Sequence, residues 1–188
     1  MTAKKKAVKR AAAKRSVVVK KSARKAPAKQ TALKLPRIGA DWPGQAGKFM
    51  GIICGENGQP DYGIVLPTDP RATLKGIYSP KENITGAQSE LDGMANTKAM
   101  AAAGSKIAKD ALAVKIDGHR DFYIPSRREA RLLQINSPTP IAKGWHWTST
   151  QCRGWDDLAW AQNFGDGNQH DFHKYDELPV RLVRRVAI

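Results

Sequence analysis

The chain has 188 residues, long enough for one domain with a hydrophobic core, and a formal net charge of +15. It has no stretch near the roughly 20 apolar residues of a membrane-spanning helix, and its longest early apolar run, "SVVV", is too short for a signal peptide. We therefore expect no membrane span and a cytoplasmic site of synthesis.

The charge is unevenly distributed along the chain. Residues 1–37 hold 14 of the 32 Lys and Arg residues and no acidic residue. The rest of the chain therefore contains 18 basic and all 17 acidic residues, a net charge of +1. Like charges this dense, without aromatic side chains, cannot bury enough apolar area to offset the entropy lost on folding. The sequence predicts a disordered basic arm over residues 1–40 and a nearly neutral globular domain over residues 41–188.

The arm is suited to a polyanion. It resembles the Lys-, Ala- and Pro-rich tails of linker histones and bacterial histone-like proteins in "KKAVKRAAAKR" and "ARKAPAKQ". Each cation placed on a phosphate releases counterions, so nucleic acid is the expected partner, bound without sequence preference. An anionic membrane or a bacterial surface polymer would also satisfy the charge, and a solubilising tail would need no partner. The expected polyanion-binding residues are Lys4, Lys5, Lys6, Lys9, Arg10, Lys14, Arg15, Lys20, Lys21, Arg24 and Lys25.

The domain begins with a predicted hairpin. Apolar runs at residues 49–53 and 62–66 flank "GENGQPD", a cluster of turn formers, and this pattern predicts two strands joined by a turn. "ATLKGIYSP" is a candidate third strand. Residues 86–116 then read as helical, with Asn96 or Thr97 as the expected cap. Gly104 interrupts the pattern, which predicts either two short helices or one helix with a break.

A further helix is marked by its start. Phe122, Tyr123 and Ile124 form a strand-like apolar run that ends at a proline. Ser126 is then a natural N-cap, and Glu129 completes a capping box for a helix through about residue 134.

The chain ends in "VRLVRRVAI", which predicts one strand with Val180 and Leu182 facing inward and Val183 as a further inward candidate.

Five segments, in this order, resemble the collagen-like-adhesin C-terminal (Lcl-type) domain family, which is common in bacterial and phage genomes. They are "GAQSELDGMANT", "IDGHRDFYIPSRREARLL", "WHWTSTQ", "AWAQNFGDGNQ" and a terminal "VRLVRRV". The second segment has Phe122 where the family usually has Trp, with Ile124 and Ala130 in place of Leu, and the third has Thr148 in place of Ser. The resemblance covers about residues 47–188.

The resemblance implies an α+β fold of the C-type-lectin-like class, in which small antiparallel sheets and one or two helices support a loop-rich segment. It also implies that the N-terminal and C-terminal strands pair, which would join the strands at Gly51 and Val180. Trp147, Trp160, Phe164 and Gly167 are signature positions, so a structural role is expected for these large rings.

Ligand contact is expected from residues 145–175, because this region carries the ligand surface in related folds. Trp145 and Trp155 fall between the signature positions and are better candidates for exposed rings. Exposed aromatic rings beside acids and amides are the usual means of holding a sugar or a protein epitope. The expected ligand-binding residues are His146, Arg153, Trp155, Asn168, His170 and Tyr175.

Catalytic and metal chemistry have less support. "WDD" and "NFGDGNQHD" contain oxygen ligands suited to calcium, but turn-forming Asp and Asn residues explain them as well. Cys54 and Cys152 lack the spacing of a metal site, and we expect them reduced and buried, with one long-range disulfide as the alternative. The histidine spacing fits no catalytic or metal motif. We expect no enzyme, no cofactor and no metal, with calcium the one candidate ion.

Two functions remain in view. The first is a non-enzymatic binding protein of phage origin, associated with a virion, with a lectin-like domain for a glycan or protein ligand and an arm that anchors it to a polyanion or an assembly. The second is a nucleoid- or packaged-DNA-associated protein, in which the arm binds nucleic acid and the domain is a spacer. The oligomeric state does not follow from the sequence.

Overall fold

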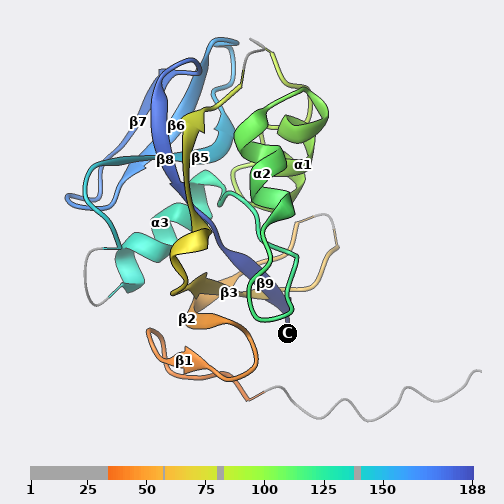
Figure 1. The fold of residues 1–188 in the computed structure, drawn as a ribbon, viewed down its shortest axis with the longest axis vertical. Helices are drawn as coiled ribbons and strands as arrows, with labels where there is room; N and C mark the ends of the chain where they lie inside the picture. The colour runs from red at the N-terminus through yellow and green to blue at the C-terminus, as the bar shows by residue number, and fades with distance from the viewer. Residues whose placement is uncertain (1–33, 57, 80–82, 138–140) are drawn as a thin grey trace, which may run out of the picture. The chain divides into compact units, whose positions relative to one another are not determined.

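The computed structural model describes residues 34–56, 58–79, 83–137 and 141–188. The predicted disordered arm lies outside these residues over positions 1–33, and with it the predicted polyanion-binding residues Lys4 to Lys25. Its last residues, 34–40, are described, and there the Gly39 amide donates to the Phe49 carbonyl and the Phe49 amide to the Ala40 carbonyl. The described part is an α+β structure with three α-helices and several small antiparallel sheets (Figure 1). None of its helices is long and apolar enough to cross a membrane.

The first sheet has the strand order β1-β2-β3-β9. Its strands are β1 (Asp41–Trp42), β2 (Gly47–Ile53), β3 (Tyr62–Pro67) and β9 (Arg184–Ala187). Strands β2 and β3 pair antiparallel, which confirms the predicted hairpin. The C-terminal strand β9 reaches this sheet by pairing with β3.

The end of the chain forms two strands, and the prediction of one strand was wrong. Strand β8 (Glu177–Arg181) pairs with β4 (Thr73–Ile77) in a separate two-stranded sheet. Val180 therefore does not pair with the strand that holds Gly51. Between β8 and β9, the Leu182 and Val183 amides donate to the carbonyls of Ala72 and Tyr123. These hydrogen bonds to other segments divide the strand, while Val180, Leu182 and Val183 are all buried, as predicted.

The third sheet has the order β5-β6-β7, from β5 (Trp145–Gln151), β6 (Leu158–Asn163) and β7 (Gln169–His173). It contains the aromatic region that the sequence marks as a candidate ligand surface. Because side chains alternate between the faces of a strand, neighbouring residues of this region point in opposite directions.

Two of the three helices are short and adjacent. A 3-10 turn, η1 (Pro70–Ala72), precedes β4, and helices α1 (Gly93–Ala102) and α2 (Lys106–Ala113) follow it. Gly104, at φ 105°, separates α1 from α2, which decides between the two predicted arrangements in favour of two helices.

The predicted cap of α1 was misplaced. Asp92 caps the helix by accepting a hydrogen bond from the Ala95 amide. Asn96 and Thr97 lie inside the helix and are buried, because their side chains bind neighbouring loops. Asn96 binds the Ser89 backbone, and the Thr97 hydroxyl donates to the Gly93 carbonyl at 2.7 Å and accepts from the Ile124 amide at 3.1 Å.

Helix α3 (Arg127–Asn136) confirms the predicted capping box. The Ser126 hydroxyl accepts a hydrogen bond from the Glu129 amide, and the Glu129 carboxylate accepts one from the Ser126 amide. The helix packs against β2, β5 and β6.

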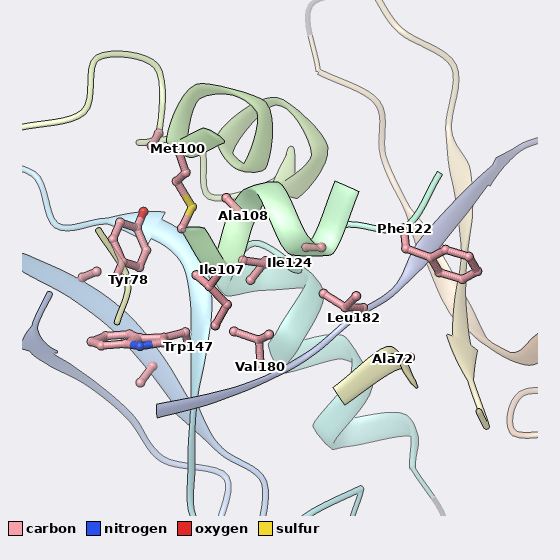
Figure 2. Close-up of a cluster of buried hydrophobic side chains, with 14 of the residues drawn as sticks. Ala72, Tyr78, Met100, Ile107, Ala108, Phe122, Ile124, Trp147, Val180 and Leu182 are labelled. Carbon is pink, nitrogen blue, oxygen red and sulfur yellow. The ribbon is translucent and has the colours of Figure 1, made fainter. Parts of the chain in front are cut away.

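A hydrophobic core holds β5 in place (Figure 2). Side chains from α1, α2 and β8 meet β5 there, among them Met100, Ile107, Val180 and Trp147. The Trp147 indole is 1% exposed, and its N–H donates to the Gly76 carbonyl at 3.1 Å. Full burial of one such side chain contributes about 1.5–3 kcal/mol. The strand that leads into the loop at residues 152–157 is therefore firmly anchored.

A candidate ligand cleft beside Trp155

A cleft of about 350 Å³ opens where the β5–β6 loop meets the start of α3. We call it the Trp155 cleft. It lies on the face of the β5-β6-β7 sheet opposite the core around Trp147. Trp147 pairs with Ala161, so the neighbouring Trp160, and Asp171 that pairs with it, point to the other face. Its lining residues are Gln88, Glu90, Arg127, Thr150, Gln151, Cys152, Arg153, Trp155, Trp160 and Asp171.

Two tryptophans form the aromatic walls of the cleft. Trp155 stands on the loop with 64% of its surface exposed, an unusual position for so large an apolar ring. Trp160 is half-buried on β6, and the Arg127 guanidinium carbon lies 3.6 Å from the centroid of its ring. At this distance Arg127 makes a cation–π contact with Trp160. One tryptophan is thus occupied by the protein itself, and the other is open.

Arg127 joins three sides of the cleft. Its Nη1 donates to the Glu90 carboxylate at 3.1 Å, and its Nε donates to Gln169 Oε1 at 3.0 Å. Its backbone amide donates to the Thr150 hydroxyl at 3.0 Å. These contacts tie α3, β5, β7 and the segment before α1 together, which gives the cleft a preformed shape.

The floor of the cleft includes a neutral thiol. Cys152 is 4% exposed, and burial raises the pKa of its thiol to about 12. A thiol with such a pKa is protonated and unreactive at neutral pH. Beside it, Lys174 Nζ donates to Gln151 Oε1 at 2.7 Å and to the Asp156 carbonyl at 2.6 Å. The floor and the loop are therefore fastened to the turn after β7.

The two cysteines are free, so the alternative of a disulfide is wrong. Cys152 is buried as expected, but Cys54 is exposed, at the end of β2.

Two of the six predicted ligand-binding residues line the cleft, namely Arg153 and Trp155. Arg153 is exposed and, among the residues that the structure describes, has no hydrogen-bond or ion-pair partner. Three further lining residues, Arg127, Glu90 and Asp171, were not predicted from the sequence. The predicted start of a helix directly after Ser126 could have indicated a role for Arg127. No local feature of the sequence marks Glu90 or Asp171 as a lining residue.

The other four predicted residues lie elsewhere. His146 is 3% exposed, its ring packs edge-on against Phe164, and burial lowers its pKa. Asn168 lies in the turn between β6 and β7. His170 pairs across the sheet with Ala161, on the face away from the cleft, where its ring contacts Trp145. Trp145 itself is half-buried rather than exposed.

Tyr175 is exposed in the turn after β7 and stacks on His173, with an interplanar angle of 10°. The His173 ring in turn pairs with Asp157 at 3.2 Å. This stack does not line the Trp155 cleft.

In the turn between β6 and β7, side-chain oxygens accept hydrogen bonds from backbone amides of the turn itself. Asn163 Oδ1 accepts a hydrogen bond from the Gly165 amide, and Asp166 Oδ1 accepts one from the Asn168 amide. These contacts are typical of Asx turns. Across the described ranges, no group of three or more His, Cys, Asp or Glu side chains is arranged to hold a metal ion.

Comparison with protein-family models and with curated proteins gave no match to this chain. The cleft must therefore be interpreted from its own geometry and chemistry.

Proposed function

We propose that this protein is a non-enzymatic recognition protein whose Trp155 cleft binds a glycan or protein ligand. The observation that carries the proposal is the 64% exposure of Trp155 on the wall of a preformed cleft. Exposing an indole to water is unfavourable, and exposed tryptophans are enriched among residues that dominate binding energy.

The remaining lining residues support recognition rather than catalysis. The carboxylates of Glu90 and Asp171 and the amide of Gln88 provide acceptors and a donor around the open ring. Such groups orient a polar ligand while the ring supplies contact area. The one thiol at the cleft, Cys152, is held neutral by burial and is unsuited to nucleophilic attack.

The proposal includes a finer fold class, that of the C-type-lectin-like domains. Small antiparallel sheets, a C-terminal strand that joins the N-terminal sheet, and a loop-rich aromatic segment are consistent with a C-type-lectin-like domain. The resemblance to the Lcl-type family supports this class, and with it a phage origin and a role on a virion or a host surface.

The experiment is a screen of the full chain on glycan and peptide arrays, repeated with Trp155→Ala. Loss of the ring should weaken binding of any true ligand by tenfold or more, about 1.4 kcal/mol. Ile135→Ala is the matched control, because Ile135 is 66% exposed on α3 and does not line the cleft. A ligand that binds both variants as well as the native chain would contradict the proposal.

A second candidate function is favoured by the charge of the arm. With 14 Lys and Arg residues and no acid over residues 1–37, the chain suits non-specific attachment to nucleic acid. Neutralising arm lysines should abolish activity if this is the main function, and should leave recognition by the Trp155 cleft intact if it is not.

A further inference from the structure

The Trp155 cleft is one of three adjoining clefts. It shares Glu90 and Arg153 with a shallow cleft of about 590 Å³, here called the middle cleft. The middle cleft shares Glu56 and Leu91 with a smaller cleft of about 150 Å³, here called the apolar slot. Because each neighbouring pair has two lining residues in common, the three clefts adjoin one another, and together they are here called the groove.

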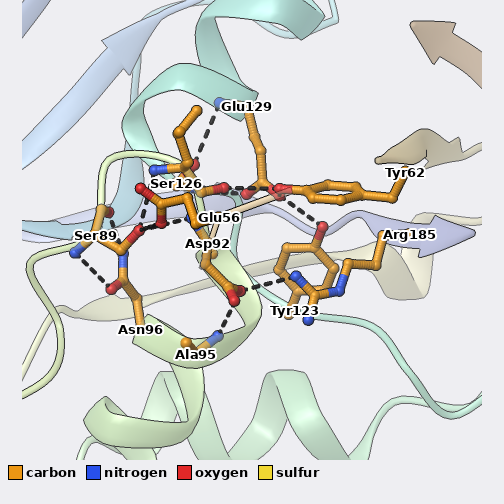
Figure 3. Close-up of polar contacts among 12 residues, drawn as sticks. Glu56, Tyr62, Ser89, Asp92, Ala95, Asn96, Tyr123, Ser126, Glu129 and Arg185 are labelled. Carbon is orange, nitrogen blue, oxygen red and sulfur yellow. Dashed lines mark hydrogen bonds and ion pairs between the residues drawn. The ribbon is translucent and has the colours of Figure 1, made fainter. Parts of the chain in front are cut away.

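The apolar slot combines apolar surface with polar groups, among which Asp92 and Arg185 pair with each other while Glu56 and Gln59 also line it. Arg185 Nη1 pairs with Asp92 at 2.9 Å, and its guanidinium carbon lies 5.1 Å from the centroid of the Tyr62 ring (Figure 3). The Tyr62 hydroxyl is already within hydrogen-bond distance of the Leu91 carbonyl and of Glu129. The Tyr62 ring, Leu91 and Pro60 remain as contact surface. Such a slot accepts an apolar side chain.

The middle cleft carries one unmatched cation. Glu90 is paired with two arginines, Arg127 at 3.1 Å and Arg128 at 3.4 Å. Arg153 has no partner among the described residues, although its guanidinium needs hydrogen-bond acceptors once water is displaced. A carboxylate suits a planar guanidinium, which binds it by two parallel hydrogen bonds.

The position of the carboxylate in the ligand follows from Glu56. Glu56 lines both the slot and the middle cleft, and its carboxylate accepts one hydrogen bond from the Ser89 hydroxyl at 2.7 Å (Figure 3). Its negative charge repels an acid at the slot end of the groove. The ligand's acid is therefore placed toward Arg153 and Trp155.

We propose that the groove binds an extended peptide segment of a partner protein, with an apolar residue in the slot, an acidic residue at Arg153 and an apolar or aromatic residue against Trp155. This proposal rests on the recognition function proposed above and narrows its ligand to a peptide. The apolar surface of the Tyr62 ring, Leu91 and Pro60 at one end favours a peptide over a glycan, because an apolar side chain buries against it without a hydroxyl group that needs a partner.

The test uses the full chain and an array of nonapeptides with Leu near one end, Trp near the other, and Glu walked through the positions between. Each peptide has a partner with Gln and a partner with Lys in place of Glu. Binding is measured by fluorescence anisotropy in about 0.3 M salt, which screens attraction between the peptides and the arm. The variants are Arg153→Glu, Arg153→Lys, Trp155→Ala and the control Ile135→Ala.

The best peptides should carry Glu nearer to Trp than to Leu, and their Gln partners should bind about tenfold more weakly. Arg153→Glu should reverse the preference in favour of the Lys partners, whereas Arg153→Lys should retain part of the preference for Glu. A misfolded domain would lose binding to all peptides and would not reverse the preference between Glu and Lys. Arg153 is also an exposed loop residue, so its replacement should leave the fold intact.

Two results would overturn the proposal. If no peptide binds in a manner that depends on Arg153 while a glycan binds in a manner that depends on Trp155, the ligand is not a peptide and the recognition function stands. If neither array shows binding that depends on Trp155, both proposals fail.

Discussion

At the scale of single residues, Glu129 shows how a buried carboxyl group is accommodated. Its carboxylate lies within hydrogen-bond distance of the Tyr62 and Tyr123 hydroxyls and the Ser126 amide (Figure 3). Burial raises its pKa. The Tyr62 hydroxyl has one hydrogen but two close acceptors, Glu129 at 2.9 Å and the Leu91 carbonyl at 2.8 Å. A proton held by Glu129 satisfies both contacts.

The stability of the fold should therefore depend on the ionisation of Glu129. The folded state retains a proton that the unfolded state releases above the ordinary pKa of 4.5. The free energy of unfolding of the native chain should fall, relative to Glu129→Gln, as pH rises from about 4.5 toward the raised pKa. Urea unfolding of both proteins across this range measures the difference.

Glu177→Gln is the control for this experiment, because 66% of the Glu177 side chain is exposed. Its unfolding should follow the pH dependence of the native chain. Parallel curves for Glu129→Gln and the native chain would show that Glu129 is ionised in the fold throughout the range.

The two thiols should differ sharply in reactivity. Cys54 is exposed, whereas Cys152 is buried with a pKa of about 12. A thiol reagent at about pH 8 should label one cysteine per folded chain and two after denaturation. Mass spectrometry of the labelled peptides identifies the site. Labelling of Cys152 in the folded chain would show that the floor of the cleft opens.

At the scale of elements, the start of α1 packs directly on the start of α3. Gly93, the first residue of α1, has no room for a side chain, since a Cβ there would lie 2.5 Å from the Ser126 amide nitrogen and 2.7 Å from the Ile124 carbonyl oxygen. The capping box of α3 is thus held from outside by α1. The placement of Arg127 at the cleft depends on this contact between helices.

Two glycine substitutions should separate lack of space from backbone strain. Gly93→Ala should destabilise the fold by about 3 kcal/mol or more, because backbone atoms cannot move aside. Gly104→Ala meets no atom within 4 Å but has φ 105°, so it should cost only about 1–2 kcal/mol. Urea unfolding of both variants checks the order, and equal losses would contradict it.

At the scale of the whole molecule, charge divides the chain into parts of different character. The arm carries the excess positive charge, while residues 38–188 hold 18 basic and 17 acidic residues. Association with a polyanion is therefore expected from the arm, and selective recognition from the domain with its cleft.

Binding of the full chain to duplex DNA should depend steeply on salt. If about eight arm charges engage phosphates, the logarithm of affinity falls with the logarithm of salt concentration at a slope of about −7. Changing Lys4, Lys5, Lys6 and Lys9 to Gln should make this slope less steep by about 3–4. A titration across a salt series measures the slope.

The matched control removes the same charge from the domain, by changing four exposed lysines to Gln, namely Lys98, Lys109, Lys115 and Lys143. It should leave the slope unchanged. If the slope changes equally when the four arm lysines or the four domain lysines are replaced, DNA binding depends on the total charge of the chain rather than on the arm.

Part of the candidate site was predictable and part was not. Trp155 and Arg153 follow from one sequence segment, because an indole in a polar, glycine-containing loop is an anomaly visible without a structure. Glu90 and Asp171 lie far from that loop in the sequence and come to the cleft only through the pairing of β6 with β7 and the contacts of Arg127. His170 illustrates the reverse error, since a shift of one residue along a strand moves a side chain to the other face.

The sequence by itself determined the distribution of charge and some of the local elements. The hairpin around residues 54–61, the capping box at Ser126 and the break at Gly104 depend on interactions between residues close in the chain. The tertiary structure alone decided the division of the last strand at Leu182, the burial of His146 and the adjoining positions of the three clefts in the groove. These features depend on hydrogen bonds and packing between segments distant in sequence, and no local pattern encodes which of them will meet.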